Sequence, residues 1–407
     1  MSRIDDLIAL HCPNGVQFKP LGEVGEFIRG NGLQKSDLVE SGVGAIHYGQ
    51  IHTHYGTWAT VTKSFVSEAL AARLRKAKPG DLVIATTSED DEAVAKAVAW
   101  IGSADVAVSG DAYIYRHTLE PKYVSYFFQS TQFQDQKKRH ITGPKVRRIS
   151  GDALAKIRIP APPLEIQREV VRVLDTFAEL EAELESELEA RRRQYKYYRD
   201  ALLTFGERTD SASKQARITT LSDIATYPNA RISSSCLDVD SYVGVDNLLP
   251  DMCGKVGSSY VPTSGTAIGY EANDILIGNI RPYLKKIWLA DSTGGTNQDV
   301  LVIRIKDEAK ATVKPRFLYH SLASDDFFAY DSQHAKGGKM PRGDKAMVMK
   351  YTIVIPPPEE QERIVSILDK FDALVNDLSS GLPAEIKARR QQYEHYRDRL
   401  LTFREAA

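Results

Sequence analysis

The chain has 407 residues, 42% of them hydrophobic and 26% charged, and its formal net charge at pH 7 is −1. This length predicts about two to three domains, and the hydrophobic content is enough for real cores. No apolar run approaches the ~20 residues that a membrane-spanning helix needs, so a membrane protein is excluded. Cys12, Cys236 and Cys253 form no CxxC pair, which argues against a structural zinc and fits a reducing cytoplasm. The balanced charge means that any surface for nucleic acid must be local.

Residues 1–160 are expected to form a first mixed α/β domain. A short lead-in helix at Ile4–Leu10 precedes strand candidates that are rich in β-branched and aromatic residues. These candidates are Ala45–Tyr48, Asp81–Thr86, Ala95–Ile101 and Ala112–Arg116. Pro121 then opens a helix with an apolar face.

Two stretches of this domain carry candidate DNA-contacting side chains, a polar loop at His47–Tyr55 and the basic segment after the Pro121 helix. Cations of a flexible loop can lie along phosphates, and polar side chains can reach base edges. The candidates are Gln50, His52, His54, Lys137, Lys138, Arg139, Lys145, Arg147 and Arg148. A metal site at His47, His52 and His54 is rejected, because no Cys or carboxylate stands at ligand spacing.

Residues 161–205 are expected to form a central helical region. Apolar and aromatic residues recur there by threes and fours, which is a heptad seam and calls for a partner helix. The seam consists of Phe177, Leu180, Leu184, Leu188, Tyr195, Tyr198 and Leu202. Apolar residues off this seam, such as Val170, Tyr197 and Leu203, are expected to need covering by another subunit.

A polar linker is expected at 206–216, followed by a second domain at 217–355 that echoes the first. The strand Gly80–Ile84 matches Asn273–Ile277, and the Pro121 helix matches one opened by Pro315. A basic loop again follows that helix, a basic–aromatic cluster and a polar turn precede it, and Asn and Gln are natural readers of adenine. The candidates are Arg281, Tyr283, Lys285, Lys286, Asn297, Gln298, Lys336, Lys339 and Arg342.

Residues 356–407 are expected to form a C-terminal helical region that repeats the central one. Gln167 recurs as Gln361 at an offset of 194, and Tyr195 recurs as Tyr393 at an offset of 198. The four extra residues fall where Ser380 and Pro383 predict a helix break, and matches this long indicate a tandem duplication. The second seam consists of Phe371, Leu374, Leu378, Ile386, Tyr393, Tyr396 and Leu400.

Catalytic motifs are missing from the sequence. There is no GxxxxGK[ST] phosphate loop and no Gly-rich turn for a methyl-donor cofactor. Glu308 and Lys310 resemble half of a nuclease motif but have no convincing partner carboxylate. The chain is therefore expected to be non-catalytic and to hold no metal or cofactor.

The duplicated pattern resembles the conserved regions of the specificity subunits of type I restriction-modification systems. The pattern is Pro-Pro…Gln…Leu-Asp…Phe followed by Ala-Arg-Arg…Gln-Tyr…Tyr-Arg-Asp…Leu-Leu-Thr-Phe, and it occurs twice at the right separation. The resemblance implies an α+β fold with two target recognition domains, spaced by two long antiparallel coiled-coil helices in an internal pseudo-two-fold repeat. It also implies double-stranded DNA as ligand and two modification (adenine N6 methyltransferase) subunits as partners. S-adenosylmethionine, ATP and Mg are then expected on partner subunits, which include restriction subunits.

Helix length allows a geometric expectation to be added. From Phe177 to Phe205 a helix would be roughly 43 Å long, or about twelve base pairs of duplex. Two short, unlike half-sites about one turn apart are therefore expected, with the helices acting as a ruler. The alternative is a stand-alone DNA-binding or scaffold protein whose coiled coil only self-associates.

Overall fold

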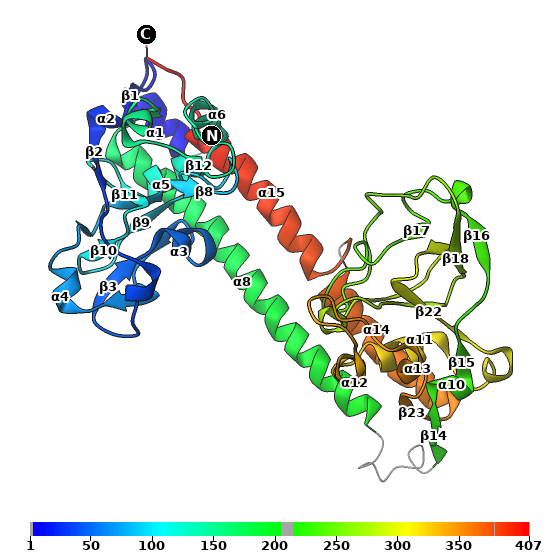
Figure 1. Cartoon of the computed structure of the whole chain (residues 1–407). Coiled ribbons are helices and arrows are strands. Elements are labelled where there is room, and N and C mark those ends of the chain that lie inside the picture. Colours follow the sequence, from blue (N-terminus) through cyan, green and yellow to red (C-terminus); the bar gives the residue numbers. More distant parts are fainter. Residues whose placement is uncertain (1–2, 205–214, 378, 407) are drawn as a thin grey trace. The chain divides into compact units, whose positions relative to one another are not determined.

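The computed structural model describes residues 3–204, 215–377 and 379–406 (Figure 1). The chain divides into two compact units, Met1–Ala182 with Ala388–Ala407 (unit 1) and Glu183–Lys387 (unit 2). Leu378 and most of the expected 206–216 linker lie outside the described residues. Among the described residues, no helix is both long enough and apolar enough to cross a membrane.

Unit 1 contains two main sheets with α-helices packed around them. The first has the order β2-β11-β7-β9-β4, and the second has the order β5-β3-β10-β6. The strands of the first are β2 (Gly25–Arg29), β11 (Ala112–His117), β7 (Leu82–Ala85), β9 (Ala97–Trp100) and β4 (Trp58–Ala59). Those of the second are β5 (Ser64–Val66), β3 (Val43–Ile46), β10 (Val106–Val108) and β6 (Lys76–Ala77). β7 and β9 are buried throughout, because each has a hydrophobic cluster on both of its faces.

Two short strand pairs complete the sheets of unit 1. They are β1 (Phe18–Pro20) with β13 (Arg158–Pro160), and β8 (Thr87–Ser88) with β12 (Arg147–Arg148). The helices are α1 (Arg3–His11), α2 (Leu21–Val24), α3 (Tyr48–Thr53), α4 (Glu68–Ala71), α5 (Pro121–Gln129), α6 (Thr131–Lys138) and α7 (Gly151–Ala155), with a 3-10 turn η1 at Lys35–Asp37. One correction follows, because Tyr48 does not extend strand β3: His47 caps α3, and most of the expected polar loop is helical.

Unit 2 repeats this plan with two four-stranded sheets, so its first sheet has one strand fewer than that of unit 1. One sheet has the order β15-β22-β19-β20 and the other β16-β18-β21-β17. Their strands are β15 (Ala225–Thr226), β22 (Val300–Ile305), β19 (Ile275–Gly278), β20 (Ile287–Leu289), β16 (Arg231–Ser233), β18 (Thr266–Tyr270), β21 (Gly294–Thr296) and β17 (Tyr242–Val243). β14 (Arg217–Thr220) pairs with β23 (Thr352–Ile355). The helices are α10 (Leu221–Ile224), α11 (Pro315–Leu322), α12 (Asp325–His334) and α13 (Lys345–Val348), and 3-10 turns lie at η2 (Ser234–Cys236), η3 (Pro282–Leu284) and η4 (Asp307–Ala309).

Three long helices carry the repeated sequence motif. α8 runs over Leu164–Leu203, and the second copy is split into α14 (Pro358–Asn376) and α15 (Leu382–Leu401). The predicted break is therefore present, and Gly381 is required there because a Cβ would lie 2.5 Å from the Ala373 carbonyl oxygen. α8 and α15 each continue from one unit into the other, so each unit contains a part of α8.

The seam residues pack as an antiparallel helix pair inside each unit. In unit 1, Phe177 of α8 stacks on Tyr396 of α15 with ring centroids 5.3 Å apart, and Glu181 pairs with Arg390. In unit 2, Tyr198 of α8 stacks on Phe371 of α14 at 5.4 Å. The expected α+β architecture with paired helices is confirmed.

The sequence predicts that three apolar residues of α8 that lie off the seam, Val170, Tyr197 and Leu203, need covering by another subunit. Val170 is fully buried within the core of unit 1, so the prediction that it needs another subunit is wrong. Tyr197 is 69% exposed, and Leu203 is partly buried against the core of unit 2.

Candidate nucleic-acid interface

The same basic hairpin is built in both units. Thr142 and Arg148 exchange two backbone hydrogen bonds of 2.9 and 2.8 Å, and Lys336 and Arg342 exchange two of 2.8 Å. Both pairs differ by the repeat offset of 194. The residue after the first member is a left-handed glycine in each case, Gly143 with φ 97° and Gly337 with φ 102°. The two hairpins therefore share the same backbone hydrogen bonds and the same left-handed glycine, although their sequences have diverged.

Each hairpin lies across the segment that follows the same buried strand. In unit 1, Arg148 pairs with Thr87 just after β7, and in unit 2, Arg342 bridges to Ile280 just after β19. The hairpin and the loop after the strand thus form one continuous edge in each unit. We call these loops the reading loops, Ser88–Ala93 in unit 1 and Arg281–Lys286 in unit 2.

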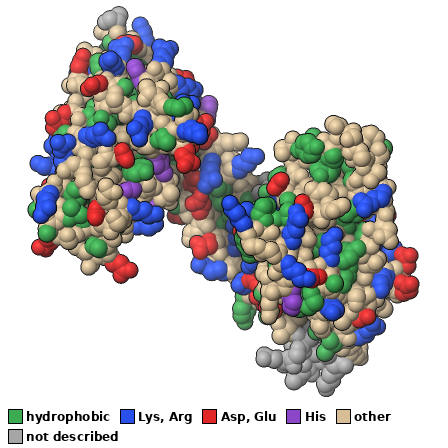
Figure 2. Space-filling model, viewed as in Figure 1, with side chains coloured by type: hydrophobic (Ala, Val, Ile, Leu, Met, Phe, Trp, Pro, Cys, Tyr) green, Lys and Arg blue, Asp and Glu red, His purple; other side chains and the backbone are tan. Residues whose placement is uncertain are grey.

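The hairpin tips present cations and apolar side chains to solvent. Lys145, Arg148 and Lys339 are exposed, as are Val146 and Met340. Arg342 pairs with Asp299 at 2.9 Å, and Lys336 pairs with Asp344 at 2.6 Å. Lys and Arg are interspersed with Asp and Glu on the visible face of each unit (Figure 2).

Helix α3 brings one predicted residue to the hairpin edge of unit 1. His52 Nε2 lies 3.0 Å from the carbonyl oxygen of Thr87, the residue that pairs with Arg148. Gln50 is turned into the structure, since its side chain donates to Ser64 Oγ at 2.7 Å and accepts from the His47 backbone at 3.1 Å. His54 is exposed and packs its ring against Tyr55.

The basic segment of unit 1 requires a correction. Lys137 is fully buried, and its ammonium donates to the carbonyl oxygens of Glu92 and Val94 at 2.9 and 3.0 Å. Burial lowers the pKa of Lys137 to about 8. The prediction that Lys137 contacts DNA is therefore wrong, because an inaccessible side chain cannot reach a phosphate. Arg147 pairs with Asp91 at 2.7 Å, Lys138 pairs with Asp135 at 3.0 Å, and Arg139 is exposed.

The basic–aromatic cluster of unit 2 divides into anchors and free side chains. Lys285 pairs with Asp325 at 2.6 Å, and Lys286 donates to the Val245 carbonyl at 2.7 Å, with its pKa lowered by burial. Tyr283 is 54% exposed. Arg281 has a left-handed φ of 52°, and its backbone N–H donates to Pro341 of the hairpin at 2.7 Å.

The polar turn of unit 2 lies before β22. The side chain of Asn297 accepts a 3.0 Å hydrogen bond from the Asp299 backbone, and Gln298 is exposed. Asp299 is also the ion-pair partner of Arg342, so this turn borders the hairpin edge. Unit 2 therefore brings Arg281, Tyr283, Asn297 and the hairpin together.

The residues that recur most clearly in the sequence have a different role, which the sequence did not reveal. Gln167 accepts from the backbone N–H of Glu120, just before α5, at 2.8 Å, and Gln361 accepts from that of Lys314, just before α11, at 2.9 Å. Both glutamines also donate to the carbonyl of a proline five residues earlier, at 2.7 Å. They fix each domain to its long helix.

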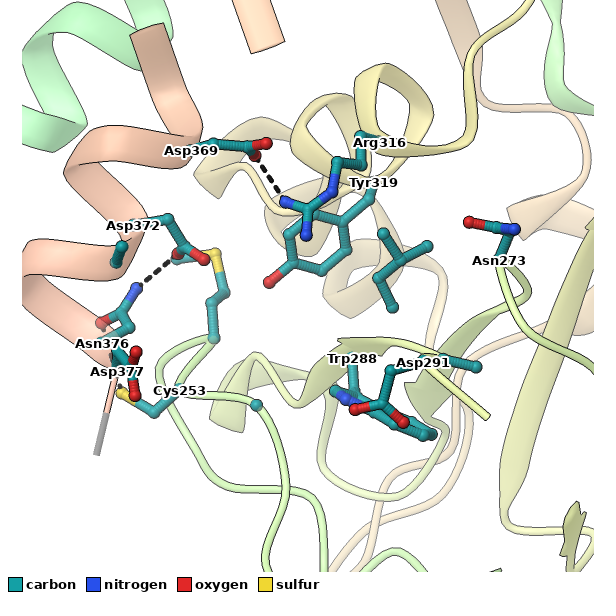
Figure 3. A pocket seen from close by; sticks show the side chains of 15 residues that line it. Cys253, Asn273, Trp288, Asp291, Arg316, Tyr319, Asp369, Asp372, Asn376 and Asp377 are labelled. Atoms are coloured by element: carbon teal, nitrogen blue, oxygen red, sulfur yellow. Dashed lines mark hydrogen bonds and ion pairs between the residues drawn. The ribbon is translucent and has the colours of Figure 1, made fainter. Parts of the chain in front are cut away.

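The recurring aspartates complete this docking. Asp175 receives the ammonium of Lys122 and the hydroxyl of Tyr126, both at 2.7 Å. Asp369 receives Arg316 and His320 at 2.8 Å, beside a pocket of about 640 Å³ (Figure 3). Burial alone would raise the pKa of Asp369, but His320 and Arg316 hold it below its usual value. This pocket lies where the second domain packs against helix α14. The hairpin edge is therefore the candidate DNA interface.

Beside Gly343, at the hairpin edge of unit 2, lies a buried carboxyl group, Asp331 of α12. It is 1% exposed, and neither of its oxygens has a hydrogen-bond partner among the residues that the structure describes. Burial raises its pKa from 3.8 to about 6. The stability that the protonated group supplies is complete below pH 3.8 and is lost as the pH rises through about 6.

We therefore expect Asp331→Asn, which is neutral and of the same shape, to stabilise the chain at pH 8 by about 1–3 kcal/mol. The gain should shrink as the pH falls below about 6 and vanish only below pH 3.8, so that part of it remains at pH 5. Urea denaturation of the full chain at pH 5 and pH 8 measures both values. The exposed neighbour Asp326→Asn is the control and should show no such pH dependence. Equal destabilisation by Asp331→Asn at both pH values would contradict the expectation.

Comparison with known proteins gives consistent matches. A family model described as the type I restriction modification DNA specificity domain matches residues 13–190 and 244–388. The specificity subunit of the type I restriction enzyme EcoR124I/EcoR124II of Escherichia coli is 30% identical over 295 residues, which are 69% of this chain and 70% of that protein. The putative specificity subunit S.HindORF215P of Haemophilus influenzae is 30% identical over 278 residues, 65% of this chain and 68% of that protein.

Solved structures share the fold at low sequence identity. The S subunit of a type I restriction-modification system from M. genitalium matches with a TM-score of 0.53 and 12% identity, covering 95% of this chain and 96% of that one. A chain from a study of complex assembly and conformational transition of the type I system matches with a TM-score of 0.59 and 16% identity. That match covers 96% of this chain and 98% of the other.

Proposed function

We propose that this chain, which belongs to the family of type I restriction-modification specificity subunits, reads one half of a bipartite DNA site with each of its two units. The observation that carries the proposal is the twin hairpin, whose backbone is the same in both units although the surrounding sequences have diverged. The same hairpin beside loops of different sequence is consistent with a phosphate contact that the two units share and base contacts that differ between them.

The contacts divide into two kinds. Lys145, Arg148 and Lys339 would lie along phosphates and fix the register of each unit. Arg281 is suited to guanine and Asn297 or Gln298 to adenine. In unit 1, His52 borders the hairpin and His54 is an exposed polar side chain of the same helix end. Each unit would therefore read a short half-site of its own.

The long helices would set the spacer and dock two adenine N6 methyltransferase subunits. Tyr197 and Tyr198 of α8 are 69% and 40% exposed, which is unusual for neighbouring aromatic residues on a helix that also packs inside its own chain. S-adenosylmethionine would be held by these modification subunits, and ATP and Mg by restriction subunits. The present chain would supply recognition and no catalytic group.

Mapping of N6-methyladenine across the source genome, with and without this chain, tests the proposal. We expect methylation at one bipartite motif to vanish on deletion and to return on complementation. An unchanged methylome, with modification subunits that co-purify with the chain and are active, would refute it.

A phosphate contact makes its own prediction. Lys145→Ala should lower the slope of log affinity against log salt by about 0.9 and leave the preferred sequence unchanged. Lys78→Ala is the matched control. Lys78 is an exposed lysine of the same unit and lies before the first residue of β7, whereas the hairpin pairs with Thr87, after the last residue of that strand. DNA-binding titrations over a range of salt measure both slopes. Equal slopes for Lys145→Ala and the wild type would remove Lys145 from the interface.

A further inference from the structure

The reading loops carry opposite charges although they occupy the same place. Both follow the equivalent strands β7 and β19, and both border the hairpin. The loop of unit 1 reads Ser-Glu-Asp-Asp-Glu-Ala over residues 88–93, and that of unit 2 reads Arg-Pro-Tyr-Leu-Lys-Lys over residues 281–286. One loop therefore contains four carboxylates where the other contains three cations, of which Lys285 pairs with Asp325 and Lys286 donates to the Val245 carbonyl.

The buried charged groups at the equivalent helix position of the two units are also of opposite sign. Lys137 lies under the acidic loop and Asp331 at the hairpin edge of unit 2, and the two positions differ by the repeat offset of 194. Both are buried, at 0% and 1% exposure. Lys137 fastens the backbone of the acidic loop through Glu92 and Val94. The loop and the buried group at the repeat position have changed sign together, which argues against an accidental run of surface acids.

The acidic loop is also tied to the hairpin itself. Arg147 pairs with Asp91 at 2.7 Å and also donates to the Gly143 carbonyl oxygen at 2.7 Å. Asp90 accepts a 2.6 Å hydrogen bond from the backbone of Ala93. Arg147, a hairpin cation that could otherwise contact a DNA phosphate, is thus paired with the loop. The four acids of the loop, Glu89, Asp90, Asp91 and Glu92, are all exposed.

We infer that this acidic loop of unit 1 competes with DNA phosphates for Arg147. Unit 1 then binds DNA tightly only at sequences whose bases donate hydrogen bonds to the carboxylates of the loop. Carboxylates can accept hydrogen bonds from the amino group of cytosine, and they repel phosphates wherever such a donor is lacking. Unit 2, whose loop contains no carboxylate to repel phosphates, would supply most of the sequence-independent affinity. The inference rests on the proposed function and adds a division of labour between the two units.

The test is a salt titration of the full chain on two duplexes, one carrying the mapped motif and one lacking it. Asp91→Asn keeps the shape of the side chain and releases Arg147. On the motif-free duplex we expect the slope of log affinity against log salt to steepen by about 0.9, the value for one additional phosphate contact. The preference for the motif over the motif-free duplex should fall accordingly.

Two further variants separate this inference from a general charge effect. Asp307→Asn removes one charge from a 2.6 Å ion pair with Lys310 that follows the end of β22, whereas the hairpin of unit 2 pairs with Asp299 before its start, and should leave the slope unchanged. The double variant Asp91→Asn/Arg147→Gln should return the slope to the wild-type value, because the released cation is gone. An unchanged slope for Asp91→Asn, or equal steepening by both single variants, would overturn the inference.

Failure of the proposed function looks different in the same titration. A wild-type chain that binds the two duplexes equally would refute recognition of a bipartite site, whatever the slopes. A wild-type chain that prefers the motif, combined with no effect of Asp91→Asn, refutes only the role of the acidic loop.

Discussion

Replacement of residues 217–355 by the corresponding domain of another specificity subunit is expected to change one half of the methylated motif and to leave the other half and the spacer unchanged. The structure gives the reason that such an exchange is feasible. The two ends of the domain are neighbours, since β14 and β23 pair from Arg217 with Ile355 to Thr220 with Thr352. A domain whose ends meet on paired strands can be exchanged as a cassette.

The graft must keep the docking contacts to the helices. Lys314 meets Gln361, Arg316 and His320 meet Asp369, and Asp325 meets Lys196 of α8. A donor domain with compatible groups at these positions should dock, whereas one lacking them should reduce methylation at every site. Genome-wide methylation mapping of the hybrid measures the motif, and the wild-type chain expressed from the same vector is the control. A hybrid that changes both half-sites would show that the two units do not read DNA independently.

Much of the architecture could be predicted from the sequence because duplication leaves a strong signal. The repeat offset, the helix break near Pro383 and the presence of Phe177 and Tyr396 in two partnered seams all follow from spacing, and the structure adds that these two rings stack on each other. The equivalence of the two basic segments also follows, and the structure adds that they form the same hairpin.

What the sequence could not supply is the direction in which each side chain points. Lys137 and Arg148 look alike in a basic run, yet one is buried beneath a loop and the other is exposed. Gln167 and Asp175 recur because they hold a domain on its helix, a role that depends on the distant residues Glu120 and Lys122. Contacts between residues some fifty positions apart leave no local pattern to read.

The ruler hypothesis can now be tested with a sharper design. The boundary between the units falls inside two helices, between Ala182 and Glu183 in α8 and between Lys387 and Ala388 in α15. We expect a paired insertion of seven residues at both points to lengthen the spacer by about three base pairs, since each insert adds roughly 10 Å of helix. Seven residues nearly complete two turns, so the docking faces keep their orientation.

An insertion in α8 alone is the matched control. It lengthens one of the two helical connections and not the other, so one set of docking contacts, those of Phe177 with Tyr396 or those of Tyr198 with Phe371, would have to give way. We therefore expect the single insertion to reduce methylation at every site and the paired insertion to retain it at a motif with a longer spacer. The half-sites should stay the same, because no residue of the hairpins or reading loops has been altered. A paired insertion that keeps the old spacer, or that changes the half-sites, would refute the ruler and leave the helices a role in docking alone.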